Sequence, residues 1–600
     1  MDSPFLSRLN TNYAPTEPEI AQIRGYVKEN RAALLDIDRA IETLTRHRDS
    51  RKSIIDQHEA LLSPIRRVPE DILSSIFSQV VNGAKEPSAL SRSHPAVFIS
   101  HASRHWRRLA LATPSLWNTI VITTPPTPNG IDGQRAGPNI NIAQDRARRW
   151  VNWMNQVIEM TKEWIVRAGS SPLSLKVEMD IKGRDGGSGD ATSTALTELI
   201  TALCSACQRW GKVNLKITTT LRGVIAPLLS LTAEDVPQLT KLYYSVFFMP
   251  DNHLQLNPND KKVALWKENI LKARSLRSLV INFSTPSYTS LGVNWAGLTQ
   301  LKAGNHDEGF DFPSYDALQL LGLCPNLEAC DLRLRRPQKY SSRYSSHPLP
   351  VIAPEDYPAI VLPRLKALTL RGWSPEEAFR TSLHLPSLRS FRLIEGDAPA
   401  SKEHHRDVLA WLQQFGAQLS NVRLEINLYT LSEMALLLRC IPNVASLRIH
   451  AMYDRFSTYE ENGVLYTHLI PLLTPNPDEG YDRVLCPSLT HFTCHFDRIS
   501  CTEKDLVNFV AARRRKGGDV ALIEEVTVDL GNTVQSLDIR EALNGRNVDL
   551  GDLKLGISYA KPSSYALTEA FAKKGCSLFP VVITLISSAP PSIDDEDIVV

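Results

Sequence analysis

The chain has 600 residues, of which 43% are hydrophobic and 22% are charged, and its formal net charge is +2. This length exceeds what one core supports, so we expect several domains or a repeat array, and the composition excludes a disordered or fibrous chain. The near-neutral charge argues against a nucleic-acid-binding protein, for which a concentrated basic excess is typical.

Several features bear on where the protein resides. No run of about 18 apolar residues is present, and the N-terminus lacks the basic and apolar regions of a secretion signal. The nine cysteines are scattered, which is typical of reduced thiols. We therefore expect a cytoplasmic or nuclear protein with no membrane partner. The densest basic run, residues 513–516, is interpreted as a solvated loop, with a nuclear-import or phosphate-binding patch as the alternative.

Residues 16–62 are predicted to form a long helix, which Thr16 and Glu19 begin with a capping box. Its apolar residues recur at heptad spacing: Ile20, Ile23, Val27, Leu34, Ile37, Ile41, Leu44, Ile55 and Leu62. Polar residues interrupt this seam, so we expect a kink or a helical hairpin near residues 47–52. The seam either packs within the chain or on a partner helix, or it pairs with a second copy in a homodimeric coiled coil. The sequence leaves this open.

Residues 63–120 are predicted to form a small helical module. Pro69, Glu70 and Asp71 suit a helix start, and apolar residues then follow at helical spacing up to Val80. A second helical segment runs from Phe98 and stops at residues 113–114. A unit of roughly fifty residues is close to the smallest that folds alone, so we expect it to need a partner surface.

The segments VPEDILSSIF and ISHASRHWRRLALATPSLWNTI in this module resemble the F-box, and the heptad helix upstream resembles F-box-like proteins of mushroom-forming fungi. This resemblance implies a trihelical module that binds the Skp adaptor of a cullin-RING ubiquitin ligase. It assigns adaptor contact to Val68, Pro69, Ile72, Leu73, Ile76 and Phe77, and anchoring of the module's core to Trp106, Leu116 and Trp117. A helical hairpin that caps the next domain and a helix-turn-helix DNA reader are the alternatives.

Residues 121–190 are predicted to contain a linker, a helix and the first strand. The helix is DRARRWVNWMNQVIEMTKEWIVRAG, with an apolar face that includes Trp150, Val157, Trp164 and Ile165, and the strand is LSLKVEMDI. The Gly-rich segment 182–193 is interpreted as a flexible loop, because no Gly-Lys-Ser/Thr follows it as in a phosphate-binding loop.

Residues 191–585 repeat one phrase, in which a Pro-x-Leu-like turn precedes an alternating strand. Examples are VPQLTKLYY, CPNLEACDLRL, LPRLKALTL, LPSLRSFRL, IPNVASLRI and CPSLTHFTC. The phrase resembles irregular leucine-rich repeats, which implies an α/β solenoid with a parallel sheet that lines a protein-binding surface. Residues 586–600 are predicted to be a disordered acidic tail.

No catalytic motif is found. Cys204 and Cys207 form a lone CxxC in a helical stretch and are interpreted as core thiols. The group Cys486, His491, Cys494, His495 and Cys501 is not expected to bind metal, because strand alternation points Cys494 away from the histidines. We therefore predict no active site and no cofactor. The predicted function is substrate recognition in a Skp-cullin-F-box ligase, with an unidentified target protein. A coiled-coil and repeat scaffold outside any ligase is the alternative.

Overall fold

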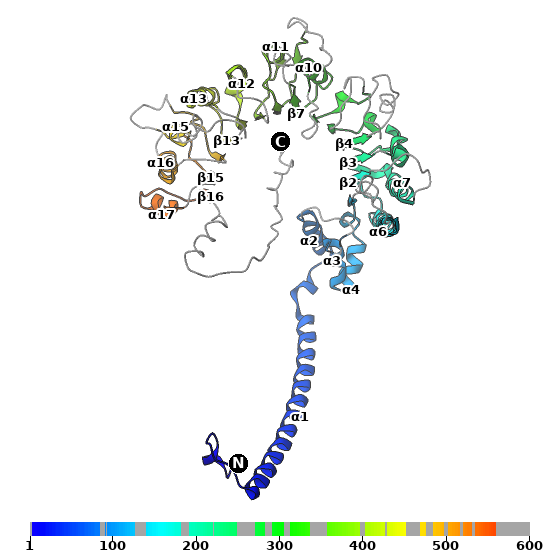
Figure 1. Cartoon of the computed structure of the whole chain (residues 1–600). Coiled ribbons are helices and arrows are strands. Elements are labelled where there is room, and N and C mark those ends of the chain that lie inside the picture. The colour runs from blue at the N-terminus through cyan, green and yellow to red at the C-terminus, as the bar shows by residue number, and fades with distance from the viewer. Residues whose placement is uncertain are drawn as a thin grey trace. The chain divides into compact units, whose positions relative to one another are not determined.

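The computed structural model describes the chain in two compact units (Figure 1). The described residues are 3–84, 91, 93–125, 140–181, 191–219, 221–248, 270–281, 291–304, 312–335, 357–395, 402–426, 429–451, 469–475, 484–496, 502–515, 520–530 and 535–559. Unit 1 comprises Met1–Gly83 and Ile99–Ala112, and unit 2 comprises Ala84–Phe98 and Thr113–Val600.

Unit 1 begins with one long helix, α1 (Glu17–Leu62). The predicted capping box is confirmed: the backbone N–H and the hydroxyl of Thr16 each donate to the Glu19 carboxylate over 2.8 Å. The predicted hairpin is wrong, because α1 continues without a break through residues 47–52. Charged side chains such as Arg48 are good helix formers and lie in solvent here, so they interrupt the apolar seam without interrupting the helix.

Three short helices follow: α2 (Glu70–Asn82), α3 (Pro95–Ala102) and α4 (Arg104–Leu111). Unit 1 contains α2, α4 and the C-terminal half of α3. The continuous helix predicted from Phe98 onward is wrong, because Ser103 has an extended backbone and separates α3 from α4. Its hydroxyl accepts the Trp106 backbone N–H over 3.1 Å, which satisfies a donor that the first turn of α4 leaves unpaired.

Unit 2 contains a sheet of 14 strands within the described residues, and all of its strand pairs are parallel. In sheet order the strands are β1 (Thr119–Thr123), β2 (Leu173–Ile181), β3 (Trp210–Thr219), β4 (Lys241–Phe248), β5 (Ser278–Ile281), β6 (Gln300–Ala303), β7 (Ala329–Leu334), β9 (Ala367–Gly372), β11 (Ser390–Ile394), β12 (Asn421–Ile426), β13 (Ser446–Ala451), β14 (His491–Phe496), β15 (Glu525–Leu530) and β16 (Lys554–Tyr559). A separate parallel pair joins β8 (Ile360–Val361) and β10 (Leu383–His384).

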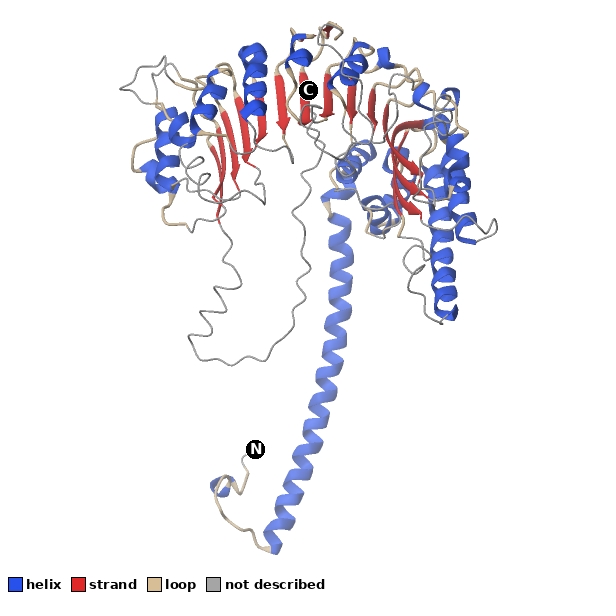
Figure 2. Cartoon of the chain, turned by 45° about the horizontal axis from the view of Figure 1, so that its top comes forward, coloured by secondary structure: helices blue, strands red, loops and turns tan. Residues whose placement is uncertain are grey.

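Helices connect many of these strands and lie to one side of the sheet (Figure 2). They are α6 (Ile140–Arg167), α7 (Ala191–Cys204), α8 (Ala226–Leu229), α10 (Ser314–Gly322), α11 (Glu377–Thr381), α12 (Lys402–Phe415), α13 (Leu431–Arg439), α15 (Leu469–Leu473), α16 (Glu503–Arg513) and α17 (Ile539–Asn544). The chain therefore has the predicted α/β character and the predicted long N-terminal helix.

The sheet has one apolar face. In β2, every second residue is buried, and the strands are paired so that buried residues stand side by side. One such row runs across neighbouring strands and consists of Leu175, Val213, Leu242, Leu279, Leu301, Cys330, Leu368, Phe391, Val422, Leu447, Phe492 and Val526. Because side chains alternate along a strand, the residues between these point to the opposite face.

The repeated phrase predicted β4, β7, β9, β11, β13 and β14, each of which begins two residues after the Pro-x-Leu-like turn of its phrase. The prediction that Leu173–Ile181 is the first strand is wrong, because β1 precedes it and pairs with it. β1 is a run of five residues that crosses the predicted boundary, at residue 120, between the helical module and the linker segment. Its apolar centre, Ile120 to Ile122, is buried, but it lacks the preceding Pro-x-Leu turn.

Arg513, at the end of α16, is buried, although residues 513–516 were predicted to be a solvated loop. Its guanidinium donates two hydrogen bonds to the Leu473 carbonyl, at 3.1 and 3.0 Å, one to Leu485 at 2.8 Å and one to Cys486 at 3.0 Å. Burial lowers the pKa of Arg513 to about 10, so it stays charged at neutral pH. The prediction is therefore wrong for this residue, which joins three segments of the chain.

We expect Arg513→Met to lower the free energy of unfolding by about 3 kcal/mol or more, because buried carbonyl oxygens lose a charged donor. The neighbouring Arg515 is exposed, so Arg515→Met should change it by less than about 0.5 kcal/mol. Urea unfolding followed by circular dichroism measures both. Equal effects of the two substitutions would contradict the structural role of Arg513.

Candidate functional site

Helix α2 has two apolar faces with different environments. Leu73 and Phe77 are each only 1% exposed and form part of the core of unit 1. Ile72, Ile76 and Val80 are 49%, 40% and 50% exposed. These three residues are spaced four apart, so they form one stripe along the helix. Isolated exposed apolar residues are common, but an ordered stripe on a short helix is typical of a surface that another protein covers.

The stripe is held in place by contacts between α2 and α4. The Phe77 ring packs against Trp106 with ring centroids 5.0 Å apart. At the start of α2, the Glu70 carboxylate accepts a hydrogen bond from Arg108 over 2.9 Å. Glu70 and Asp71 also lie in the first turn, where negative charge stabilises a helix. These contacts fix which side of α2 faces outward.

The structure separates the six residues to which adaptor contact was assigned. Pro69, Ile72 and Ile76 are exposed and Val68 is half-buried, so these four can reach a partner. Leu73 and Phe77 lie in the core, where they position the other four. Of the three residues assigned to the module's core, Trp106 is half-buried in unit 1, whereas Leu116 and Trp117 are buried in unit 2.

An aromatic cluster in unit 2 surrounds Trp117. Trp117 and Trp164 meet edge to face with centroids 5.1 Å apart, and the Arg167 guanidinium lies 4.6 Å from the Trp117 ring centroid. His94 also packs edge-on against Trp164, at 4.6 Å, and its Nδ1 accepts the Ala96 backbone N–H over 3.1 Å. The predicted apolar face of α6 therefore packs, through Trp164, on His94 and Trp117, two residues of the segment that was assigned to the helical module.

The predicted thiol and histidine groups do not converge. Burial raises the pKa of Cys204 to about 12 and also raises the pKa of Cys207, which disfavours the thiolates that bind metal. In β14, Cys494 is buried whereas His491 and His495 are exposed, which confirms the predicted alternation. Cys501 lies outside the described residues. Within the described ranges, no group of three His, Cys, Asp or Glu side chains is arranged to hold a metal ion.

A buried polar network was not predicted. Glu395 follows β11 and is 1% exposed. It accepts a hydrogen bond from the Tyr429 hydroxyl over 2.5 Å and lies 3.1 Å from Nε2 of His404 in α12. His405 stacks on the Tyr429 ring at 3.9 Å, and its Nδ1 lies 3.2 Å from the Glu433 carboxylate. The only sequence signal was the His-His pair, which does not identify partners that are distant in the sequence.

This network has a structural role, because its groups contact one another and have little access to solvent. His404 and Glu395 have side chains that are each 1% exposed. The Ser374 backbone N–H donates to Nδ1 of His404 over 3.2 Å. The network therefore ties the segments that follow β9 and β11 to α12 and α13. Its hydrogen bonds to the Glu395 carboxylate and to Nδ1 of His404 offset part of the cost of burying these polar groups.

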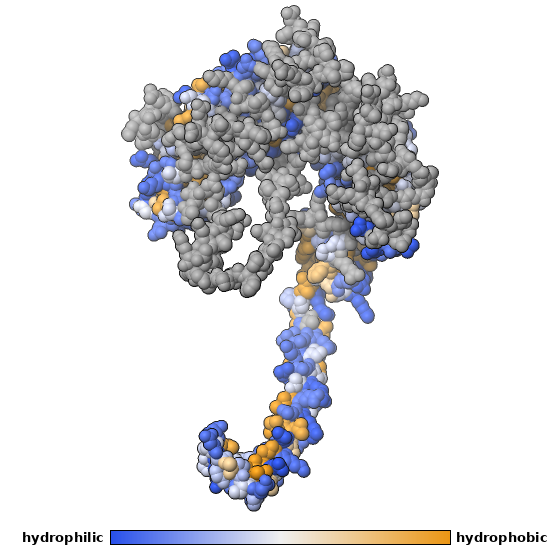
Figure 3. Space-filling model, viewed as in Figure 1, coloured by the Kyte–Doolittle hydropathy of each residue, from blue (hydrophilic) through white to orange (hydrophobic). Residues whose placement is uncertain are grey.

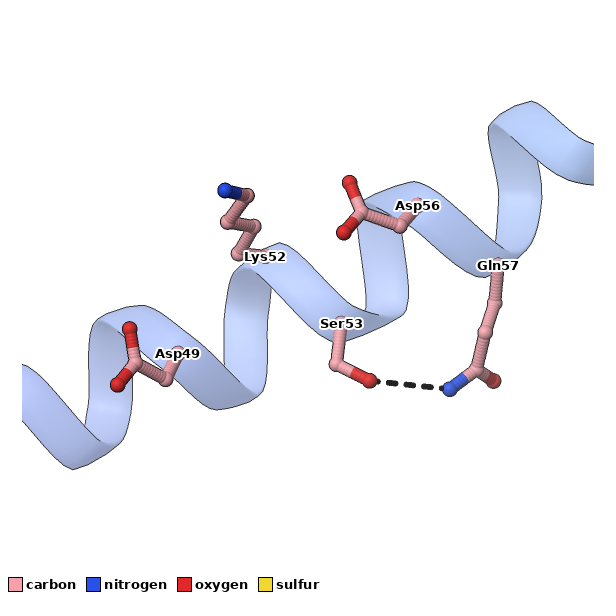
Figure 4. Close-up of a pocket in the computed structure, with 5 residues that line it drawn as sticks. All are labelled: Asp49, Lys52, Ser53, Asp56 and Gln57. Atoms are coloured by element: carbon pink, nitrogen blue, oxygen red, sulfur yellow. Dashed lines mark hydrogen bonds between the residues drawn. The ribbon is translucent and has the colours of Figure 1, made fainter. Parts of the chain in front are cut away.

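The surface of α1 contains a shallow hollow lined by Asp49, Lys52, Ser53, Asp56 and Gln57 (Figure 4). Gln57 donates to the Ser53 hydroxyl over 3.1 Å. All five residues lie on successive turns of one helix, and a single helix cannot enclose a small molecule. The hollow is therefore no candidate for a ligand site.

The sequence matches no protein-family model, and no curated protein is significantly similar to it. Among the described residues, none of the helices is both long enough and apolar enough to span a bilayer. Function is therefore inferred from residues and geometry, of which the exposed stripe on α2 is the strongest feature.

The buried His94 should make the free energy of unfolding depend on pH, because burial lowers the pKa of its imidazole to about 4. Unfolded histidine titrates near 6.5, so between about pH 6.5 and pH 4 the unfolded chain binds a proton that the folded chain does not. We expect stability to fall as pH decreases through this range. The variant His94→Asn keeps an acceptor for the Ala96 N–H but has no imidazole to titrate. Between pH 7 and pH 4, its free energy of unfolding should therefore fall by on the order of 1–3 kcal/mol less than that of the wild type.

Urea unfolding of both proteins at a series of pH values measures this difference. Because other groups titrate in the same range, the relevant quantity is the difference between the two pH profiles. Parallel profiles would contradict a neutral buried His94.

Proposed function

We propose that the protein is a substrate receptor of a Skp-cullin-F-box ubiquitin ligase, with an F-box-like module at residues 63–120 and an irregular leucine-rich-repeat solenoid that binds a target protein. The observation that carries this proposal is the stripe of Ile72, Ile76 and Val80 on α2. It lies in the segment that resembles the F-box, and it includes two of the residues to which that resemblance assigns adaptor contact.

The second half of the chain supports the same function. A receptor requires no catalytic group of its own, since it acts by raising the local concentration of target lysines near a conjugating enzyme. It does require an extended surface for a protein partner. The parallel sheet of unit 2 carries polar and charged side chains on the face opposite its apolar row, and such a face suits protein recognition.

The test is binding of the full-length protein to a Skp-type adaptor. We expect the wild-type protein to bind, and Ile72→Asp together with Ile76→Asp to reduce the affinity at least about a hundredfold, because two apolar contacts at the centre of an interface are replaced by charges. Isothermal titration calorimetry measures the affinities. Both residues are exposed in the free protein, so the variant should remain folded.

Val166→Asp is the matched control, because Val166 is an apolar residue of α6 that is 74% exposed and lies outside the module. It should bind the adaptor as the wild type does. A folded wild-type protein that does not bind any Skp-type adaptor would remove the ligase proposal.

A second candidate function is that of a dimeric scaffold outside any ligase, and the surface of α1 favours it. Figure 3 shows hydrophobic patches on the surface of this helix. Four residues of the heptad seam are each more than half exposed: Leu34, Ile37, Ile41 and Leu44. A second copy of the helix would cover them in a coiled coil.

We expect the full-length protein to be dimeric by sedimentation equilibrium if α1 pairs with a second copy. Leu34→Glu with Ile41→Glu should then shift it to monomer, because charges would enter the seam. Leu35→Glu changes a residue that is equally exposed but lies off the seam, and it should leave the dimer intact. A wild-type monomer at high micromolar concentration would exclude this scaffold.

A further inference from the structure

Three arginines form a row on the open face of the unit 2 sheet. Arg392 of β11 pairs in register with Arg423 of β12, which pairs in register with Arg448 of β13. Adjacent strands are about 4.8 Å apart, so the three guanidinium groups project from neighbouring positions. In β13, Leu447 and Ile449 are buried whereas Arg448 is exposed, which places the row opposite the apolar face.

Among the described side chains, a single carboxylate pairs with these three arginines. Glu425 accepts from Arg392 over 2.7 Å and from Arg423 over 2.9 Å. Arg448 has no ion pair or hydrogen bond with any described side chain. Burial lowers the pKa of Arg423, and the charges of Arg392 and Arg448 contribute to the same shift. Like charges directly opposite one another destabilise a sheet. Pairing with the buried Glu425 accounts for Arg392 and Arg423, but it does not account for a third arginine at position 448.

The surroundings of Arg448 are polar on the same face. His450 follows it in the next outward position and lies in register with His495 of β14, with ring centroids 6.3 Å apart. Thr493 stands beside Arg448 in the register of the arginine row. A ligand bound at Arg448 could therefore also form hydrogen bonds with these side chains. The neighbouring Glu425 already pairs with Arg392 and Arg423.

We propose that the arginine row, Arg392, Arg423 and Arg448, binds an acidic segment of a partner protein, in which aspartates and glutamates occur as a run. Within the part of the chain that the structure describes, three guanidinium groups pair with one carboxylate, which leaves an excess of two positive charges for the ligand. In an extended peptide, alternate side chains are roughly 7 Å apart, so two carboxylates of one segment can reach separate guanidinium groups of the row. Guanidinium groups pair with carboxylates through two parallel hydrogen bonds.

A protein segment suits this surface better than nucleic acid does. The same face carries Asp331, which forms a bidentate pair with Arg371 at 2.8 and 2.7 Å, and also Asp529 beside His495. A continuous phosphate backbone would meet these carboxylates as well as the arginines. The three arginines occupy neighbouring positions on three adjacent strands, which matches a short acidic segment.

The test uses full-length protein and a fluorescein-labelled peptide that carries a run of aspartates and glutamates. We expect fluorescence anisotropy to report saturable binding that weakens with salt, and a peptide with Asn and Gln in place of the acids should not bind. Arg448→Ala should weaken binding by about tenfold or more, which corresponds to loss of charged hydrogen bonds. Arg439→Ala is the matched control, because Arg439 is an exposed arginine on α13, and it should bind as the wild type does.

Several outcomes would overturn the proposal. They are equal binding by the Arg448 and Arg439 variants, equal binding of the neutral peptide, and binding of a phosphopeptide or single-stranded DNA without binding of the acidic peptide. The chain's own acidic run, Asp594–Asp597, is another possible occupant. If removal of residues 586–600 increased the affinity for the probe and the tail peptide competed with it, the row would serve that tail instead of a partner.

This inference rests on the proposed function only in taking the bound segment to be part of a target protein. The peptide experiment contains no adaptor, and the adaptor experiment does not involve Arg448. Loss of peptide binding would therefore leave the ligase proposal standing, and failure to bind the adaptor would leave the acidic-segment surface standing.

Discussion

The architecture of unit 2 depends on one repeated backbone interaction at the start of its strands. A single carbonyl oxygen accepts two successive N–H groups from the beginning of the next strand. The acceptors are Thr240, Arg277, Thr299, Glu328, Lys366, Arg389, Ser420, Ala445 and Thr490. Each acceptor directly follows a buried anchor residue, namely Leu239, Leu276, Leu298, Leu327, Leu365, Leu388, Leu419, Val444 and Leu489. Burial of the anchor thereby fixes the position of the carbonyl that sets the register of the next strand.

The residue before the anchor adds a second link between successive strands. Asn326 and Asn443 donate from their side-chain amides to Ala296 and Ala417 at 2.9 and 2.7 Å, and the Ser387 hydroxyl donates to Pro363 at 2.6 Å. In each case the acceptor is a backbone carbonyl that precedes the previous strand. These links run along the edge where the strands begin, so the residues within the strands are free to vary on the open face. The arginine row is built from such residues.

The repeated phrase predicted strands well because it encodes this anchor directly. A Pro-x-Leu turn followed by alternating apolar residues specifies both the buried leucine and the face that it shares with the strand. β1 and the Glu395 network were missed for a common reason, since neither depends on local sequence pattern. β1 forms a strand because it pairs with β2. Glu395 can be buried because Tyr429 and His404, which lie on other segments of the chain, contact its carboxylate.

The same reasoning explains why periodicity identified the surface of α2 only in part. Leu73 and Phe77 alternate with Ile72 and Ile76 along the helix, and all four have the same apolar character, so sequence alone grouped them together. Packing of Phe77 against Trp106 and pairing of Glu70 with Arg108 decide which of them turn inward. The apolar surface that a helix leaves exposed is therefore determined by the contacts of its neighbours, and on α2 this exposed surface is the stripe of Ile72, Ile76 and Val80.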